Sequence, residues 1–295
     1  MKYKLIILIN LIIWLACGDT SVEVDKSTYR PKIVVDAVLY TGKAISNIKI
    51  SRNFPLNTII IEEQRIITDA FITISDAGGL TDTLIYSVKE NYHSENQRIQ
   101  IVGGATYRLY VSAEIDGEKL WTSSSTTAPY PGFSIDHDHS SSGDIPYLQH
   151  NTNGSLTNPR ITFNRSAGAE FYGVSAVAVE GDSLTFIEDN IFGVDREILD
   201  DNMNYFTHIS TWASAENQPD GKSTIEIPWW LIYFYSPYRI TVYAGDLNFY
   251  HFFITHNNVQ NIDGNLREPL FYFDGDGIGL FGSAIRDSIY FNVIP

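Results

Sequence analysis

The amino-acid sequence predicts an all-β protein, with an N-terminal immunoglobulin/fibronectin-like sandwich followed by a second β-rich, sandwich-like domain. Short runs of β-branched and aromatic residues alternate with polar residues and are separated by turn residues, as in strands that bury one face. No segment carries an apolar stripe of helical period over twelve or more residues, which argues against an α/β protein. Of the 295 residues, 44% are hydrophobic and 13% aromatic, enough to form a packed core.

The first residues predict a secretion signal rather than part of a domain. Two lysines precede an apolar run at residues 5–16 that is interrupted only by Asn10. A helix of a dozen residues spans roughly 18 Å, whereas a membrane-spanning helix crosses a hydrocarbon core of about 30 Å. The sequence therefore predicts a signal peptide at residues 1–16.

The only cysteine, Cys17, directly follows this run and the small residue Ala16. The arrangement resembles a bacterial lipobox, in which the cysteine is lipidated and becomes the new N-terminus; the alternative is a buried free cysteine. We expect lipid on Cys17 to anchor the chain in the outer membrane, with the leaflet left open. Residues 17–31 are polar and lack apolar periodicity, so they predict a tether between the lipid and the folded part.

Residues 32–128 predict the first sandwich. Seven short strands are expected there, at residues 32–40, 45–52, 71–75, 84–88, 98–102, 106–112 and 119–122. Tyr107 enters the sixth of these strands just after Gly104, the position of a tyrosine corner, whose hydroxyl bonds to the backbone upstream. The alternative is an ordinary strand aromatic, and both interpretations give Tyr107 a structural role.

Residues 123–142 are rich in serine, threonine, proline and glycine, and they predict loops and a domain boundary. The second domain is therefore placed at residues 129–295. Residues 191–204 predict helical or irregular structure, and residues 247–256 predict a strand or a short helix. The strands expected in this domain lie at residues 160–164, 171–180, 183–187, 224–227, 239–244 and 288–294.

Several stretches match one known family in order along the chain. The match begins with the apolar signal and Cys17. The stretches that follow are residues 33–38, residues 69–74, Gly104-Ala-Thr-Tyr107-Arg-Leu109, Ala128-Pro129, Gly277-Ile-Gly279-Leu-Phe-Gly282 and residues 291–295. By these stretches the chain resembles the domain of unknown function 4249 family, lipoproteins of Bacteroidota. Residues 273–276 depart from the pattern of the family.

The resemblance implies an outer-membrane lipoprotein from a family that is often encoded near TonB-dependent receptors. It implies no catalytic residues, because the activity of the family is not established. A TonB-dependent receptor is therefore the partner that the resemblance implies.

Composition and charge exclude several classes of function. The chain has 20 Lys+Arg against 35 Asp+Glu, a formal net charge of −15, so attraction to nucleic acid or to an anionic membrane surface has the wrong sign. A single cysteine excludes a disulfide scaffold and any multi-cysteine metal site. No Gly-x-Ser-x-Gly elbow is present, and the paired carboxylates give no geometry for acid–base catalysis. We expect no cofactor, no nucleic-acid partner and no enzyme activity; an extracellular hydrolase or metal-dependent enzyme is the least supported alternative.

The C-terminal glycines have the spacing of a dinucleotide-binding fingerprint, Gly277-x-Gly279-x-x-Gly282. That fingerprint needs a strand before the glycines, a helix after them and an acidic residue about 20 positions further on. Only 13 residues follow Gly282, too few for a βαβ unit. We expect a turn or bulge in a terminal hairpin instead.

Two short clusters are weak candidates for metal binding. His137 and His139 alternate with aspartates and would share one face of an extended chain, so they could hold zinc or copper with a third ligand from elsewhere. Asp274 and Asp276 begin like a calcium loop, but the fifth and twelfth positions of an EF-hand would be isoleucines. The alternatives are a polar loop for the histidines and a solvated acidic turn for the aspartates.

The segment at residues 228–238 is the strongest candidate for binding a ligand or partner. It holds six aromatic residues between two prolines, and they cannot all face one core by alternation. An exposed aromatic patch marks a surface for a protein, a sugar or a lipid. The alternative is packing between sheets. The candidate binding residues are Trp229, Trp230, Tyr233, Tyr235 and Tyr238.

Together these features predict a lipid-anchored, non-enzymatic binding protein of the outer membrane and cell envelope, an accessory to a TonB-dependent transporter. The alternative is a stand-alone surface adhesion or glycan/matrix-binding lipoprotein. The ligand itself is left open by the sequence.

Overall fold

The computed structural model describes residues 29–55, 58–169, 171–213, 215–256 and 269–295. The predicted signal peptide at residues 1–16, Cys17 and most of the predicted tether lie outside these residues. Among the described residues, no helix is both long enough and apolar enough to cross a membrane.

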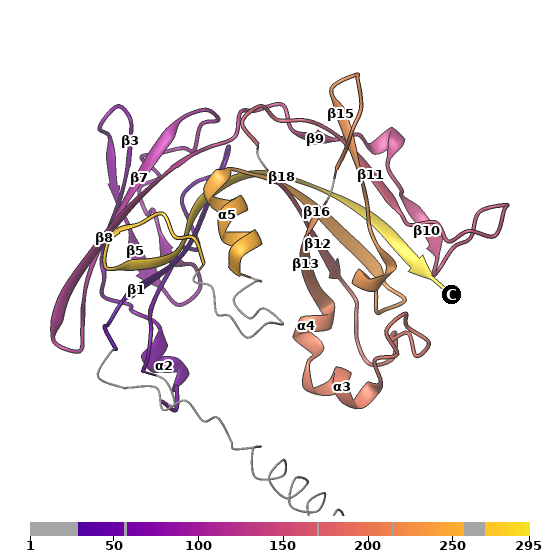
Figure 1. The fold of residues 1–295 in the computed structure, drawn as a ribbon, viewed down its shortest axis with the longest axis horizontal. Coiled ribbons are helices and arrows are strands. Elements are labelled where there is room, and N and C mark those ends of the chain that lie inside the picture. Colours follow the sequence, from indigo (N-terminus) through magenta and orange to yellow (C-terminus); the bar gives the residue numbers. More distant parts are fainter. Residues whose placement is uncertain (1–28, 56–57, 170, 214, 257–268) are drawn as a thin grey trace, which may run out of the picture.

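One long sheet extends across both halves of the described structure (Figure 1). Its central strand, β18 (Gly277–Ile294), pairs in parallel with β1 (Ile33–Tyr40) up to the pair Tyr40–Ala284, and antiparallel with β16 (Pro237–Gly245) from Ala284 onward. The strand β10 (Gly143–Pro146) pairs in parallel with the end of β18. The sheet order is β13 (His208–Ala213), β12 (Phe171–Ala178), β16 (Pro237–Gly245), β18, β1 (Ile33–Tyr40) and β2 (Lys49–Arg52).

The first sandwich packs a second sheet against the β1 and β2 end of the long sheet. Buried apolar side chains from both sheets form its core, among them Ile33 and Val35 of β1 and Leu109 of β7 (Thr106–Ile115). The short elements α2 (Glu62–Arg65), β5 (Ile85–Ser87) and β6 (Asn91–His93) complete this half. The order of the second sheet is β17 (Asp274–Gly275), β8 (Glu118–Thr127), β7 (Thr106–Ile115), β3 (Phe71–Asp76) and β4 (Thr81–Thr83).

The second sandwich packs a smaller sheet against the β12, β16 and β18 part of the long sheet, with a separate buried cluster between them. The order of this sheet is β14 (Glu216–Asn217), β15 (Lys222–Glu226), β11 (Arg160–Asn164) and β9 (Ser134–Ile135). The helical elements of this half are η2 (His137–His139), α3 (Arg196–Asp201), α4 (Met203–Thr207) and η3 (Trp229–Leu231). The helix α5 (Leu247–His256) lies between the two halves: Phe249 packs against Phe171 of β12, and Asn248 donates to the Ser125 carbonyl of β8.

The predicted all-β, sandwich-like fold is confirmed. The C-terminal segment, however, contributes to both sandwiches: Phe281 lies in the first core, while Ile289, Phe291 and Val293 lie in the second. These four residues are all odd-numbered, so alternation places them on the same side of β18. The first sandwich is thus built from residues on both sides of the predicted boundary at residue 128.

The tyrosine corner predicted at Tyr107 is present. Its buried hydroxyl accepts a hydrogen bond from the Val102 N–H at 2.7 Å and donates one to the Gln100 carbonyl at 3.2 Å. These two bonds hold the loop that precedes β7. The strand expected at residues 98–102 is not formed.

Residues 123–127 are part of β8, so the prediction of a loop there is wrong. The strand pairs with β7 over its full length, and its small polar side chains on the inner face are buried. The Thr122 hydroxyl donates to the Asp274 carbonyl at 2.8 Å, the Ser124 hydroxyl donates to the Tyr272 carbonyl, and the Thr126 hydroxyl bonds to Asp246. A strand can carry serine and threonine inward when another chain segment supplies their partners. The strand expected at residues 183–187 is also not formed.

The glycines of Gly277-x-Gly279-x-x-Gly282 belong to strand β18 and open no helix. Gly279 has φ +109°, and a Cβ added there would lie 2.1 Å from the Val35 carbonyl oxygen. A Cβ at Gly277 would lie 2.0 Å from the Thr122 hydroxyl oxygen. Glycine is therefore needed where the chain crosses between the two sheets of the first sandwich.

The last residues of the predicted tether are attached to the first sandwich. The Tyr29 hydroxyl donates to the Asn53 carbonyl at 3.2 Å and accepts from Arg52 at 3.1 Å. Arg52 in turn forms a bidentate ion pair with Asp116. Any tether therefore ends before Tyr29.

Candidate functional site

The structure divides the predicted aromatic binding segment between the core and a cavity. Trp229, Tyr233 and Tyr238 are buried in the second core, with exposed fractions of 1%, 5% and 0%, so they present no surface to a ligand. Trp230 and Tyr235 are half-buried and pack against the edge of that core. Packing between the sheets, the alternative interpretation, thus describes three of the five residues.

The local backbone explains this division. The segment is a 3₁₀ turn, η3, followed by irregular chain, so strand alternation does not apply to it. The Tyr238 hydroxyl accepts hydrogen bonds from the N–H groups of Tyr233 and Phe234, each at 3.1 Å, and so turns the segment back into the core. In η3, Trp229 and Leu231 face inward, and the Trp229 indole donates to the Thr157 carbonyl at 3.0 Å.

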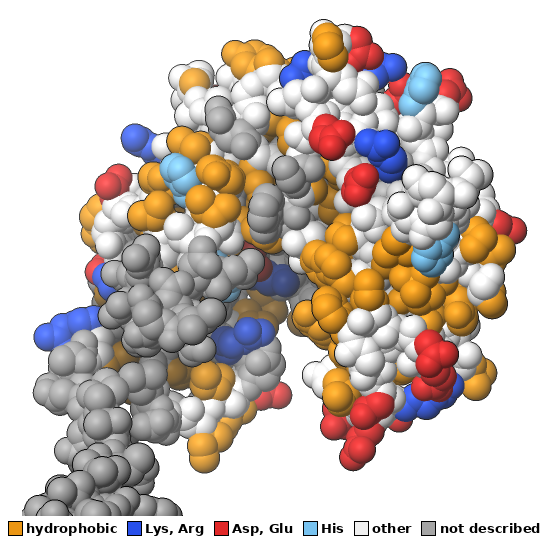
Figure 2. All heavy atoms as spheres, turned by 45° about the vertical axis from the view of Figure 1, so that its right-hand side comes forward, with side chains coloured by type: hydrophobic (Ala, Val, Ile, Leu, Met, Phe, Trp, Pro, Cys, Tyr) orange, Lys and Arg blue, Asp and Glu red, His pale blue; other side chains and the backbone are white. Residues whose placement is uncertain are grey.

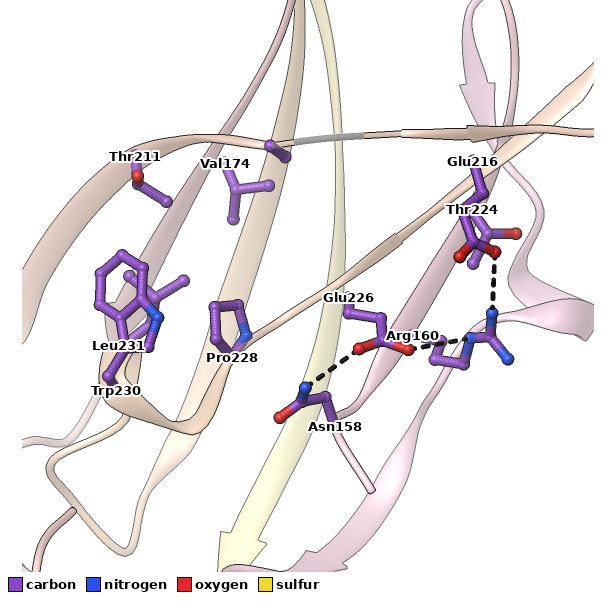
Figure 3. A pocket seen from close by; sticks show the side chains of 11 residues that line it. Asn158, Arg160, Val174, Thr211, Glu216, Thr224, Glu226, Pro228, Trp230 and Leu231 are labelled. Atoms are coloured by element: carbon purple, nitrogen blue, oxygen red, sulfur yellow. Dashed lines mark hydrogen bonds and ion pairs between the residues drawn. The ribbon is translucent and has the colours of Figure 1, made fainter. Parts of the chain in front are cut away.

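Trp230, between the two inward residues, forms one wall of a cavity of about 340 Å³ (Figure 3). Pro228, Leu231 and Val174 extend the apolar lining around its ring. Among the described residues, the Trp230 indole makes no hydrogen bond. The cavity therefore presents an aromatic ring whose polar edge is available to a ligand.

The opposite wall of the cavity is a row of polar side chains from β11, β14, β15 and the loop before β11 (Figure 3). Asn158 donates to Glu226 at 3.0 Å, and Glu226 lies 3.9 Å from the Nε atom of Arg160. Arg160 donates to Glu216 through its Nη2 atom at 3.5 Å. These side chains share one face of the sheet because Arg160 pairs with Glu226 across β11 and β15, and Glu216 pairs with Thr224 across β14 and β15.

A second cavity, of about 310 Å³, continues along the same face and shares Arg160 and Thr224 with the first. Between the cavities lie Thr162 and Thr224, only 6% and 5% exposed although they point away from the core. Their hydroxyls bond to each other at 3.0 Å, and Gln218 donates to Thr224 at 2.8 Å. We call the two cavities together the β11–β15 groove; the two threonines form its floor.

The far end of the groove contains one of the predicted metal candidates. His139 lines the second cavity, where its Nδ1 atom lies 2.9 Å from an oxygen of Asp136, and Lys222 donates to the same carboxylate at 2.6 Å. The hydrogen bond from Lys222, together with that from His139, lowers the pKa of Asp136 to about 2. Residues 137–139 form the 3₁₀ turn η2 rather than extended chain, so the predicted shared face of His137 and His139 is not formed.

Asp274 and Asp276, the other metal candidates, lie in the first sandwich. Both take part in pairing through the backbone: the Asp274 carbonyl accepts from Thr122, and the Asp276 N–H donates to the Trp121 carbonyl at 2.8 Å. The Asp276 carboxylate lies 3.7 Å from the Lys32 ammonium group. In the part of the chain that the structure describes, no three His, Cys, Asp or Glu residues gather closely enough to hold a metal ion.

At the right of Figure 2, in the half that carries the second sandwich, charged side chains of both signs lie above and below a broad band of hydrophobic ones. Sequence reasoning found only Trp230 and His139 of the groove and missed its polar row. The available signal was the polar alternation of residues 160, 162 and 164 and of residues 222, 224 and 226. The sequence did not show that these two strands pair.

The fold is all-β, with two sandwiches that share one long sheet and a groove lined by an aromatic ring and polar side chains. The chain belongs to the family described as Domain of unknown function (DUF4249), which matches residues 19–284. A comparison with curated proteins finds no match.

Among solved structures, the chain is similar to the crystal structure of a tetra-tandem repeat in the extending region of a large adhesion protein. The alignment has a TM-score of 0.24 and 11% identity, and covers 90% of this chain. The chain spans 49% of that protein chain, about half its length. A similarity this low defines no relationship of fold or function.

Proposed function

We propose that the chain is a lipid-anchored binding protein of the bacterial outer membrane, an accessory that holds a ligand for a TonB-dependent transporter. The β11–β15 groove is the observation that supports a binding role. It is a concave face of two joined cavities, each of a size that accommodates a small ligand. The lipobox at Cys17 and the membership of the family support the anchoring and the envelope location.

The side chains of the groove favour binding over catalysis. Glu216 and Glu226 are 80% and 54% exposed and share the single guanidinium of Arg160. A catalytic acid or base usually needs a carboxyl group in a desolvated site that changes its proton affinity. Exposed, mutually paired carboxylates instead resemble the polar rim of a recognition site.

The anchor and the groove are placed suitably for such a role. Tyr29 is fixed to the first sandwich, whereas the groove lies on the second sandwich, so a lipid at Cys17 would leave the groove free of the attachment point. The net charge of −15 keeps the folded part from lying flat on an anionic membrane surface. The groove would then face solvent or a partner protein.

A detergent pull-down from native outer membranes tests this proposal. The full-length protein, tagged at its C-terminus, is recovered in mild detergent and its partners are identified by mass spectrometry. We expect a β-barrel receptor in near-stoichiometric amount. The Cys17→Ala variant should lose membrane association while its folded part keeps the same unfolding temperature.

Recovery of the lipoprotein without a receptor would contradict the accessory role. The chain would then act alone, as an adhesion or matrix-binding lipoprotein. Membrane association that survives Cys17→Ala would contradict the lipid anchor.

A further inference from the structure

We infer that the β11–β15 groove binds a neutral oligosaccharide, with Trp230 stacked on a sugar ring and the Asn158–Glu226–Arg160–Glu216 row bonding to the sugar hydroxyls. The inference rests on the proposed function in one respect: both place the ligand in this groove. It goes further because it names the chemical class of the ligand.

The apolar wall fits the face of a sugar ring. A pyranose presents C–H groups on its faces, and an indole offers a broad, flat surface of negative charge density to meet them. Trp230 is positioned firmly for this contact because its neighbours in η3, Trp229 and Leu231, are both anchored in the core. Binding on a rigid aromatic costs little conformational entropy.

The polar wall fits the rim of hydroxyl groups around such a ring. The amide of Asn158, the two carboxylates and the guanidinium of Arg160 alternate donors with acceptors along the row (Figure 3). Each is planar with two or more polar atoms, so each can bond two neighbouring hydroxyls at once. Their ion pairs are long and exposed, and pairs of that kind contribute little, so a ligand can replace them at small cost.

The charges of the groove disfavour an anionic ligand. Arg160 already faces two carboxylates, Glu216 and Glu226. Lys222 is bonded to Asp136 and lies in the field of Asp220. Neither cation is free to neutralise a phosphate, sulfate or uronate, and the surrounding carboxylates would repel one.

The second cavity indicates a chain of sugars rather than a single one. Arg160 and Thr224 belong to both cavities, so a ligand stacked on Trp230 can continue past them over the floor. Beyond the floor, Gln218, Lys222 and His139 offer further polar atoms. A ligand of several units would therefore bind more tightly than a monosaccharide.

Binding assays on purified, lipid-free protein test the inference. The probes are neutral hexasaccharides of glucose, xylose, mannose and N-acetylglucosamine, with polygalacturonate and heparin hexasaccharides and hexalysine as charged comparisons. We expect at least one neutral hexasaccharide to bind, to quench tryptophan fluorescence and to keep its affinity in high salt, because a neutral ligand is not screened. Trp230→Ala should weaken binding by about tenfold or more.

Three further variants keep the test clear of folding effects. Glu226→Gln changes an exposed side chain and should weaken binding without altering the unfolding temperature. Trp230→Phe should restore part of the affinity, because it keeps a ring in place. Trp121→Ala removes another partly exposed tryptophan, stacked on Tyr110 in the first sandwich, and should leave binding unchanged.

Several results would overturn the inference: no neutral hexasaccharide bound at millimolar concentration, salt-sensitive binding of a charged probe alone, or sugar binding that Trp230→Ala and Glu226→Gln leave intact. These results are independent of the pull-down. A receptor recovered without sugar binding would reject only the ligand class, and sugar binding without a receptor would reject only the accessory role.

Discussion

The two sandwiches each contain a row of hydroxyl side chains on one face of a sheet, and the two rows differ in where their hydrogen-bond partners come from. In the first, Thr122, Ser124 and Thr126 of β8 are buried because residues 272–274 and Asp246 supply their hydrogen-bond partners. In the second, Thr162 and Thr224 are similarly buried, but their hydroxyls bond to each other and to the nearby Gln218, on the floor of the β11–β15 groove. A polar row on a sheet can thus be bonded by distant segments of the chain or by neighbours in the same sheet.

The comparison extends to the two buried tyrosines that shape each half. Tyr107 holds the loop before β7, and Tyr238 holds residues 233 and 234, which follow the turn that carries Trp230. Tyr107 makes one bond as acceptor and one as donor, whereas Tyr238 accepts two N–H groups. Burial raises the pKa of the Tyr238 hydroxyl, so it stays protonated at ordinary pH.

The largest effect on stability is expected at Asp246, which supplies the hydrogen-bond acceptor for Thr126 in the row of β8. Its buried carboxylate accepts from the N–H groups of Phe249 and Ser283, at 3.0 and 3.1 Å, and bonds to the Thr126 hydroxyl. Asp246→Ala leaves three donors without this acceptor and should lower the free energy of unfolding by about 3 kcal/mol. Urea unfolding measures the loss.

Asp246→Asn is the control for this prediction, since its carbonyl oxygen can still accept from both N–H groups. It should cost clearly less than Asp246→Ala. Equal losses in the two variants would mean that the negative charge, rather than the hydrogen bonds, closes the first row.

The next effect compares the two tyrosines directly. Tyr238→Phe leaves two buried N–H groups without an acceptor and should lower the free energy of unfolding by about 2 kcal/mol. Tyr107→Phe leaves one N–H and one carbonyl without a partner, and buried N–H groups tolerate this less well than carbonyls, so its loss should be smaller. Only Tyr238→Phe should also weaken ligand binding in the groove, because it frees residues 233 and 234, which follow the turn of Trp230.

Chemical unfolding of both variants, together with ligand-binding assays on the folded proteins, measures these effects. A larger loss of stability in Tyr107→Phe than in Tyr238→Phe would contradict the difference that the hydrogen bonds of the two tyrosines predict.

These features separate what local sequence patterns can predict from what they cannot. Strand β11 was predicted with the bounds that the structure gives it, and Tyr107 was predicted as a corner, because both depend on residues close in the chain. The pairing of Arg160 with Glu226 joins residues 66 positions apart. Alternation in each strand gives the polar face but not its partner, so the groove was not predictable.

Two of the differences between prediction and structure share a physical cause. The serines of β8 were assigned to a loop because strands usually carry apolar residues inward, yet the C-terminal segment, 148 residues away at Tyr272, supplies their partners. The aromatic segment was predicted as a binding surface with some rings exposed, yet Trp229, Tyr233 and Tyr238 are buried, and the Tyr238 hydroxyl bonds to the backbone of residues 233 and 234. In both places a distant or backbone hydrogen bond overrides the local pattern.

A smaller effect concerns the pH dependence of stability. The pKa of Asp246, which bonds to the polar row of β8, is raised, whereas the pKa of Asp136, at the far end of the groove, is lowered. Burial raises the pKa of Asp246, so the folded state holds its proton more tightly than the unfolded state. The stability it contributes is complete below the unfolded pKa and is lost as pH rises through the folded pKa. The pKa of Asp136 is lowered to about 2, so its contribution is present above its ordinary value of 3.8 and is lost as pH falls toward 2.

Unfolding free energies between roughly pH 2 and pH 6 for the unmodified protein, Asp246→Asn and Asp136→Asn measure both slopes. The difference between the unmodified protein and Asp246→Asn should shrink as pH rises, and the difference for Asp136→Asn should grow. Slopes of the same sign for the two variants would contradict the opposite environments.

The smallest effect on stability is expected at the rim of the groove. Glu216 is 80% exposed and 3.5 Å from Arg160, so Glu216→Gln should change the free energy of unfolding by less than about 0.5 kcal/mol. Asp116 of the first sandwich also pairs with an arginine, but Arg52 is only 19% exposed and bonds to it through two nitrogens while holding Tyr29. Asp116→Asn should therefore cost about 1 kcal/mol.

Urea unfolding measures the loss in free energy of unfolding for each variant. The ratio of the two losses tests whether the side chains at the rim of the groove stabilise the fold or are held weakly enough for a ligand to bond to them. A rim built for recognition keeps its polar atoms only weakly engaged, so that hydroxyl groups can replace Glu216 as the partner of Arg160. If Glu216→Gln costs as much as Asp116→Asn, the pair at Arg160 holds β14 to β11. The polar row would then be a structural network, closed by the chain in the same way as the row of β8.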